Sequence, residues 1–211
     1  MTPKPGEYLE TQYLDVLRET QSPFAAAHFD MEAGVPQMAS IARNKNNGFE
    51  ISLTFNWHDG NRLLTLDAAG HPDFNKAWNN IQSASFHVDD PQHLTLAAPG
   101  EPVRSYVWVG DAARFVANQV LAGQYRDERG QIYEFGTDGA ARFPSESGTY
   151  NLMMDQVFDF FDSFRMGETG RYIAYRRNGN QLTLYPITAD NGPGEGLPDY
   201  THPIARLQRS R

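Results

Sequence analysis

Alternation of apolar and polar side chains constrains this chain most, and it is clearest between residues 49 and 57. The apolar positions there are Phe49, Ile51, Leu53, Phe55 and Trp57, and Glu50, Ser52, Thr54 and Asn56 stand between them. A period of two is the signature of a strand with one buried and one solvated face. Such strands are typical of antiparallel sheets. The segment therefore predicts a mainly β, antiparallel fold.

Glycine-containing turns separate several such segments and predict which residues pair across each hairpin. The turns are Asn46-Asn47-Gly48, Asp59-Gly60, Thr137-Asp138-Gly139 and Asn178-Gly179. The predicted pairs are Ile41 with Leu53 and Ala39 with Phe55; Phe55 with Leu64, Leu53 with Leu66 and Ile51 with Ala68; Tyr133 with Phe143, Phe135 with Ala141 and Glu134 with Arg142; and Tyr175 with Leu182 and Ile173 with Leu184. Apolar residues meet on one face in all four hairpins, which favours a meander of consecutive strands.

Further segments complete the prediction. Strands are expected near residues 83–88, 93–98, 104–109 and 124–127, and short helices over residues 7–19 and 112–121. The second helix has Asp111 as its N-cap and Gly123 as its stop. Residues 153–166 fit either a strand or a helix, and their density of Phe favours a strand.

The domain organisation follows from the spacing of these elements. We expect a linker and helix over residues 1–22, one barrel-like domain over residues 23–187, and a Gly- and Pro-rich tail over residues 188–211. The alternative is two packed β units with a half boundary near residue 110. The fold class is thus a mainly β meander or barrel with two short helices.

Composition excludes several classes of function. The formal net charge of −8 opposes binding to a nucleic-acid backbone. The chain has no Cys, which excludes disulfides, thiol catalysis and Cys-ligated zinc. It contains no apolar run long enough for a transmembrane helix. The chain opens on Met-Thr-Pro-Lys-Pro-Gly, which resembles an initiator methionine followed by a polar linker. We therefore expect a truncated exported protein of the bacterial periplasm or envelope. A lipid anchor is a further element that the truncation would have removed. The alternative location is the cytoplasm.

One stretch resembles a known family. Gly123-Gln124-Tyr125 follows a predicted helical turn, and Tyr133-Glu134-Phe135, Asp138-Gly139 and Gln181-Leu182-Thr183-Leu184-Tyr185 follow as hairpin segments. Over residues 121–187 this order resembles lipocalin-like, calycin-type bacterial barrels, which open on Gly-x-Trp after a helical turn. Tyr125 stands where that family has Trp. The resemblance implies a barrel formed by a meander of strands, a fold that often holds a small apolar ligand.

Two groups of residues are candidate sites. The expected ligand-binding residues are Phe55, Trp57, His58, Phe86, Tyr125 and Tyr133, as the aromatic lining and mouth of a barrel. His87, Asp89 and His93 carry the residue types that ligate a divalent metal. The simpler interpretation of the second group is a polar hairpin loop, because Asp90-Pro91 is a turn signal. We assign no catalytic residue and no cofactor.

Other polar clusters have less specific interpretations. Asp155, Asp159 and Asp162 fit a solvated face, or a buried Asp paired with Arg165 or Arg171. The cluster Tyr172, Tyr175, Arg176, Arg177 and Tyr185 has the composition of a surface that meets a partner. The leading prediction is a non-enzymatic binding protein for a small, largely apolar ligand. The alternatives are a protein–protein or inhibitor module and, third, a metal-dependent hydrolase.

Overall fold

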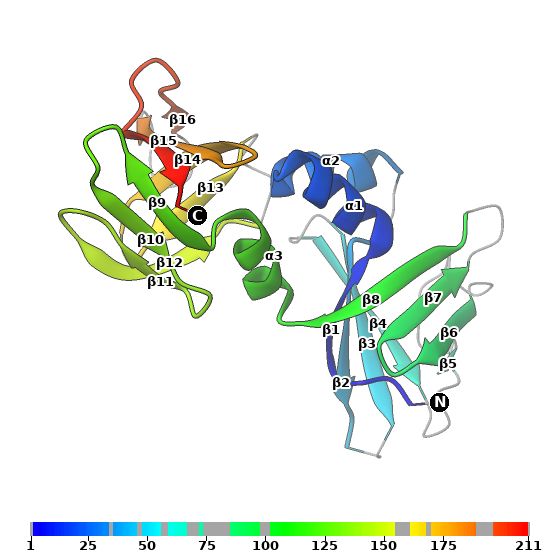
Figure 1. Ribbon diagram of the computed structural model, residues 1–211. Coiled ribbons are helices and arrows are strands. Elements are labelled where there is room, and N and C mark those ends of the chain that lie inside the picture. The colour runs from blue at the N-terminus through cyan, green and yellow to red at the C-terminus, as the bar shows by residue number, and fades with distance from the viewer. Residues whose placement is uncertain are drawn as a thin grey trace. The chain divides into compact units, whose positions relative to one another are not determined.

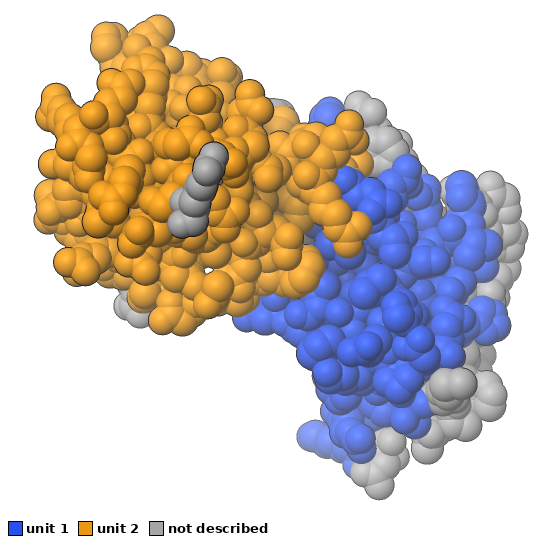
Figure 2. Space-filling model, viewed as in Figure 1, with its two compact units in different colours: residues 1–15, 27–112 blue, residues 16–26, 113–211 orange. Residues whose placement is uncertain are grey.

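A computed structural model describes residues 2–33, 36–45, 48–55, 59–66, 72–73, 85–97, 102–154, 161–167, 170–188 and 196–210. The chain divides into two compact units (Figures 1 and 2). Unit 1 comprises Met1–Asp15 and Ala27–Ala112, and unit 2 comprises Val16–Ala26 and Ala113–Arg211. Each unit has a sheet of its own, which differs from the single barrel expected over residues 23–187. The described helices are too short or too polar to cross a lipid bilayer.

Unit 1 contains an eight-stranded antiparallel sheet with the order β5-β4-β3-β2-β1-β8-β7-β6 among its described strands. The strands are β1 (Gly6–Glu10), β2 (Met38–Arg43), β3 (Phe49–Phe55), β4 (Asp59–Leu66), β5 (Pro72–Asp73), β6 (Ser85–Asp90), β7 (His93–Ala97) and β8 (Arg104–Gly110). Between β1 and β2 run two helices, α1 (Thr11–Thr20) and α2 (Pro23–Ala33), and the division between the units passes through both.

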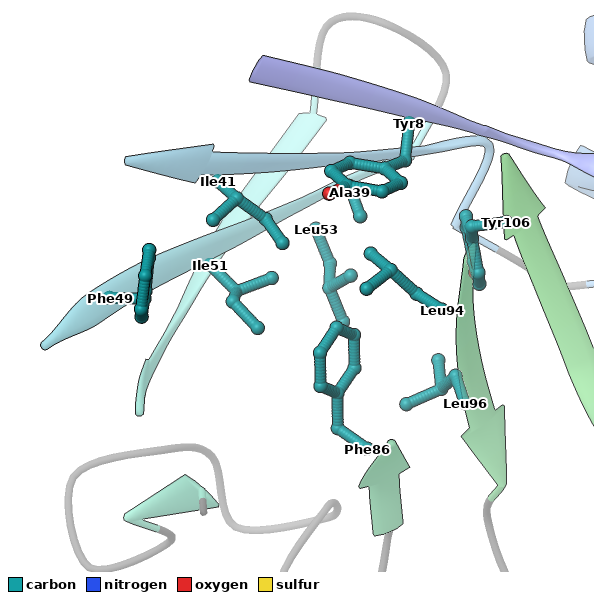
Figure 3. Packing of buried hydrophobic residues seen from close by; sticks show 10 residues of the cluster. All are labelled: Tyr8, Ala39, Ile41, Phe49, Ile51, Leu53, Phe86, Leu94, Leu96 and Tyr106. Carbon is teal, nitrogen blue, oxygen red and sulfur yellow. The ribbon is translucent and has the colours of Figure 1, made fainter. Parts of the chain in front are cut away.

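The sheet of unit 1 curls so that its two halves share one core. Phe86, Leu94 and Leu96 from the β6–β7 side pack with Ile51 and Leu53 of β3 (Figure 3). Tyr8, Ala39, Ile41, Phe49 and Tyr106 complete this buried cluster. Burial of one face of every contributing strand provides the hydrophobic stabilisation of the half-barrel.

Unit 2 contains a closed antiparallel barrel of eight strands. The strands are β9 (Gly123–Asp127), β10 (Ile132–Phe135), β11 (Ala140–Arg142), β12 (Ser147–Leu152), β13 (Ser163–Met166), β14 (Tyr172–Asn178), β15 (Gln181–Thr188) and β17 (Ala205–Arg209). Neighbours in sequence pair from β9 to β15, and β17 closes the ring by pairing with both β15 and β9. β16 (Leu197–Pro198) pairs outside this ring with β15, and α3 (Ala112–Val120) precedes β9.

Aromatic rings fill the interior of the unit 2 barrel. The ring of Phe135, which is 1% exposed, lies 5.3 to 6.0 Å from the rings of Tyr125, Phe143, Tyr150 and Phe164, all close to edge-on. Edge-to-face packing suits the quadrupoles of these rings. Phe135 is therefore the centre of the core of unit 2.

The predicted hairpins can be compared with the observed registers. The β10–β11 hairpin is confirmed, because Glu134 pairs with Arg142 and Phe135 with Ala141. The other three predicted registers are wrong. Ile41 pairs with Ile51 rather than Leu53, Ile51 with Leu64 rather than Ala68, and Tyr175 with Leu184 rather than Leu182, so these partners are shifted by two or four residues. An even shift leaves a residue on the same face of its strand. Near the β3–β4 turn the register changes at an irregularity, and Phe55 pairs with Asp59 rather than with Leu64.

The predicted helices and tail are corrected in part. The helix at residues 112–121 is confirmed as α3, which covers Ala112–Val120. Residues 7–10 form strand β1 instead of helix, because β1 lies between β2 and β8 and buries both Tyr8 and Leu9. The predicted tail contains β17, whose Ala205 and Leu207 are buried. Of residues 153–166, Ser163–Met166 form strand β13, and residues 155–160 lie outside the described part.

Truncation of the central ring tests the role of Phe135 in the barrel core. Phe135→Ala should lower the free energy of unfolding of unit 2 by about 3–5 kcal/mol, because it removes a fully buried ring and leaves a cavity. The measurement is hydrogen–deuterium exchange of peptides from residues 123–209 in rising urea. Ile132→Ala is the control on the same strand, since Ile132 is 39% exposed and should lose about 1 kcal/mol or less. Equal losses in the two variants would contradict the central position of Phe135.

Candidate ligand-binding site

The six predicted ligand-binding residues fall in both units. Phe86 is 3% exposed in the core of unit 1. Phe55 ends β3, but its side chain, like Trp57 and His58, lies outside the described residues. Tyr125 and Tyr133 belong to the barrel of unit 2. The described members of this group therefore belong to two different units.

The two tyrosines of unit 2 have different surroundings. Tyr125 is 0% exposed, and its hydroxyl donates to the carbonyl oxygen of Leu121 at 2.9 Å, so it is part of the packed interior. Tyr133 is 7% exposed and borders a surface hollow of about 320 Å³, which the turn after β9 and the segment before β17 also line. Burial raises the pKa of the Tyr133 hydroxyl. Of these two tyrosines, Tyr133 is therefore the one that could contact a ligand without rearrangement of the core.

The predicted metal ligands lie on the β6–β7 hairpin and have other partners. Asp89 accepts a hydrogen bond from the Thr95 hydroxyl at 2.5 Å, and His93 Nδ1 lies 2.7 Å from Asp90 Oδ2. His87 is exposed and pairs in register with Thr95. Within the described ranges, His, Asp and Glu side chains nowhere gather in threes as ligands for a metal ion.

A polar end of the unit 1 core was missed by the sequence analysis. Glu10 and Gln37 are 2% and 1% exposed, respectively. Glu10 lies two residues beyond Tyr8 and pairs with Tyr106, and Gln37 lies two residues before Ala39. Alternation along a strand places both side chains on the face that carries the apolar cluster. We call Glu10, Gln37 and the Tyr106 hydroxyl the polar end of unit 1.

Hydrogen bonds hold most groups of this polar end. Tyr106 donates to the Pro36 carbonyl at 2.9 Å, and Glu10 Oε2 accepts from the Tyr13 backbone N–H at 2.8 Å. Gln37 Nε2 donates to the Ala27 carbonyl at 2.8 Å, which fixes the orientation of its amide. Gln37 Oε1 then remains buried with no hydrogen-bond partner in the described part of the chain. Such an orphaned acceptor is rare in folded proteins.

The electrostatics of the polar end are dominated by Glu10. Burial raises the pKa of its carboxyl above the ordinary value, against the backbone hydrogen bonds from Tyr13 and Gln12 and the charge of Arg104. A carboxyl in this setting and an orphaned amide oxygen are both hydrogen-bond acceptors near neutral pH. The arrangement can therefore receive N–H or O–H groups at the end of an apolar core.

The sequence contained little signal for this site. Glu10 lies in the segment 7–19, for which the sequence predicted a helix, and Gln37 lies in a separate segment between Pro36 and β2. Only the pairing of β1 with β2 and β8 unites them. Comparison with models of protein families, with curated proteins and with solved structures found no match for this chain.

The raised pKa of Glu10 predicts a pH-dependent stability. A raised folded-state pKa contributes stability that is present below the unfolded-state pKa and is lost as the pH rises through the folded-state pKa. The free energy of unfolding of the wild type, relative to Glu10→Gln, should therefore be higher at pH 4 than at pH 7.5. The sign of this difference follows from the raised pKa of Glu10, because the folded state favours its protonated carboxyl.

Urea titrations of the wild type and Glu10→Gln at both pH values measure this difference. Glu50→Gln is the control, since Glu50 lies on the exposed side of β3. The difference in free energy of unfolding between the wild type and Glu50→Gln should change less with pH than the difference between the wild type and Glu10→Gln. If both differences changed equally with pH, the assignment to Glu10 would be contradicted.

Proposed function

We propose that this chain is a non-enzymatic binding protein that holds a small, largely apolar ligand in unit 1. The apolar cluster on the inner face of the half-barrel supports this proposal, since ligand pockets in such proteins are mainly apolar with a few placed polar groups. Phe86, one of the predicted ligand-binding residues, belongs to that cluster. Val88 and Trp108, which are only partly buried, pack against it.

The observation that carries the proposal is the orphaned Oε1 of Gln37. A buried acceptor without a donor costs about 1–3 kcal/mol. A ligand that brings a hydroxyl or N–H group to Gln37 recovers that free energy, while its apolar body lies against the cluster. The proposed ligand is therefore an apolar molecule with one hydrogen-bond-donating end, such as an alcohol or amide. The envelope location expected from the sequence stays a prediction.

A protein–protein module is the second candidate function. The exposed outer surface of unit 2 favours it, because Tyr200 is 38% exposed and its ring lies 5.0 Å from the ring of Tyr185. Tyr172 and Tyr185, two tyrosines of the predicted partner surface, are both partly exposed. Aromatic residues of this kind are enriched where proteins meet. Loss of partner capture by Tyr185→Ser, with ligand binding in unit 1 intact, would favour this alternative.

The binding of decan-1-ol and decane tests the leading proposal. The wild type should bind decan-1-ol more tightly than Gln37→Met does, by about tenfold, since one buried hydrogen bond is worth about 1–1.5 kcal/mol. The two proteins should bind decane with similar affinity, because decane has no donor. Tryptophan fluorescence measures both titrations, with Trp108 as a reporter beside the cluster.

The matched control for this experiment is Gln92→Met, which changes an exposed glutamine in the β6–β7 turn. It should bind both probes as the wild type does. Failure of the wild type to bind either probe would overturn the proposal. Equal affinity of the wild type and Gln37→Met for decan-1-ol would overturn the assigned position of the polar group.

A further inference from the structure

Unit 2 contains a pocket of about 330 Å³ at the edge of its barrel, which is separate from the polar end of unit 1. Its lining includes Gln21, Phe24, Phe161, Asp162, Arg176 and Tyr200. We call it the rim pocket. All of these residues belong to unit 2, and the sequence analysis assigned the pocket no ligand.

Asp162 supplies the negative charge of the rim pocket. Its Oδ1 accepts from the backbone N–H of Phe24 at 2.8 Å, and its carboxylate also accepts from the Ser22 hydroxyl. Ser22 caps α2, because its Oγ accepts from the Ala25 N–H at 3.0 Å. Burial raises the pKa of Asp162 to about 6, so the carboxyl is mainly ionised at pH 7.5. A carboxylate has about four lone-pair positions, so Asp162 can accept further hydrogen bonds.

Arg176 supplies the positive charge. Its guanidinium carbon lies 3.6 Å from the centre of the Tyr200 ring, and the side chain is exposed. Stacking on an aromatic face orients the planar guanidinium group but does not occupy its N–H donors. The ion pairs of His93 with Asp90, Arg171 with Glu146 and His202 with Asp199 do not involve Arg176. Arg176 is therefore placed to bind an anion, bidentately if that anion is a carboxylate.

Gln21 marks the rim pocket independently. It is the one non-glycine residue of the described chain with a positive φ, at 55°. That left-handed conformation costs a non-glycine residue about 1–2 kcal/mol. Its Oε1 is buried and has no hydrogen-bond partner among the described residues. Backbone strain and an orphaned acceptor thus coincide at one wall of the pocket.

Aromatic rings line part of the rim pocket, beside the polar side chains of Thr20, Ser22 and Arg177. Phe161 is 9% exposed and Tyr175 is 1% exposed, and Phe24 is partly buried. A ligand for this pocket needs an apolar body against these rings, hydrogen-bond donors for Gln21 and Asp162, and an anionic group for Arg176. One small molecule that carries all three is a zwitterion with an apolar substituent.

The geometry points to the rim pocket as a binding site for a free α-amino acid with an apolar side chain. The ammonium group donates to the Asp162 carboxylate and to Gln21 Oε1, and the carboxylate binds Arg176. The side chain lies against Phe24 and Phe161. The volume of about 330 Å³ is at the lower end of the range for small-molecule pockets, which suits a ligand of this size. This inference does not depend on ligand binding in unit 1.

Isothermal titration calorimetry at pH 7.5 with L-phenylalanine tests the inference. L-Phenylalanine should bind, and N-acetyl-L-phenylalanine and L-phenylalaninamide should each bind at least tenfold more weakly, because each lacks one of the two charges. Asp162→Asn and Arg176→Gln should each weaken the binding of L-phenylalanine by at least tenfold. Near-UV circular dichroism checks that both variants are folded, and the amide oxygen introduced by Asp162→Asn still accepts from the Phe24 N–H.

The matched control is Arg142→Gln, which removes an exposed arginine of β11 outside the rim pocket. It should bind L-phenylalanine as the wild type does. Absence of binding at millimolar L-phenylalanine would overturn the inference. The inference would also be overturned if either capped derivative bound as tightly as L-phenylalanine does. Unchanged binding of L-phenylalanine by Arg176→Gln would overturn it as well. The decan-1-ol titration then still reports on unit 1 alone, so the two proposals can fail separately.

Discussion

Burial of one face of each strand is the constraint on which most of both sheets depends. In unit 2 it places Phe135 against four other rings, and in unit 1 it brings Phe86 of β6 onto Leu53 of β3. A shift of one residue in any of these strands would exchange the apolar and polar faces, whereas a shift of two preserves them. The hydrophobic effect therefore strongly determines which face of each strand is buried, but it only weakly determines which of the registers two residues apart is adopted. Turns and backbone hydrogen bonds complete the selection.

This difference explains which parts of the fold could be predicted from the sequence. The strand class, the helix α3 and the β10–β11 register are confirmed, because local alternation and turn chemistry agree there. The hairpin of β14 and β15 shifted by two residues, so that Asn178 pairs with Gln181 and the turn is Gly179-Asn180. Gly179 adopts a φ of 57° in that turn, as a hairpin of this length requires. Two overlapping two-residue turns are possible in this segment, Asn178-Gly179 and Gly179-Asn180, and the local sequence does not distinguish them.

Long-range pairing accounts for the elements that the sequence analysis missed. β1 has neighbours on both edges, and Tyr8 and Leu9 are both 0% exposed, so a period of two is absent from it. β17 pairs with β9, which lies some eighty residues earlier in the chain. The same reasoning applies to the sites. Glu10 and Gln37 meet only because β1 pairs with β2, and Asp162 meets Ser22 only because the segment 16–26 belongs to unit 2.

Both units contain buried polar atoms without a hydrogen-bond partner among the described residues, such as Gln37 Oε1 in unit 1 and Gln21 Oε1 in unit 2. The interior of the unit 2 barrel consists of interlocking rings, and Asp162 and Arg176 line the rim pocket. Unit 1 buries a carboxyl as well as an orphaned amide oxygen at one end of its apolar core. Apolar residues of similar volume would avoid that cost. The ligand proposed for unit 1 would supply the donor that Gln37 Oε1 lacks and so offset part of that cost.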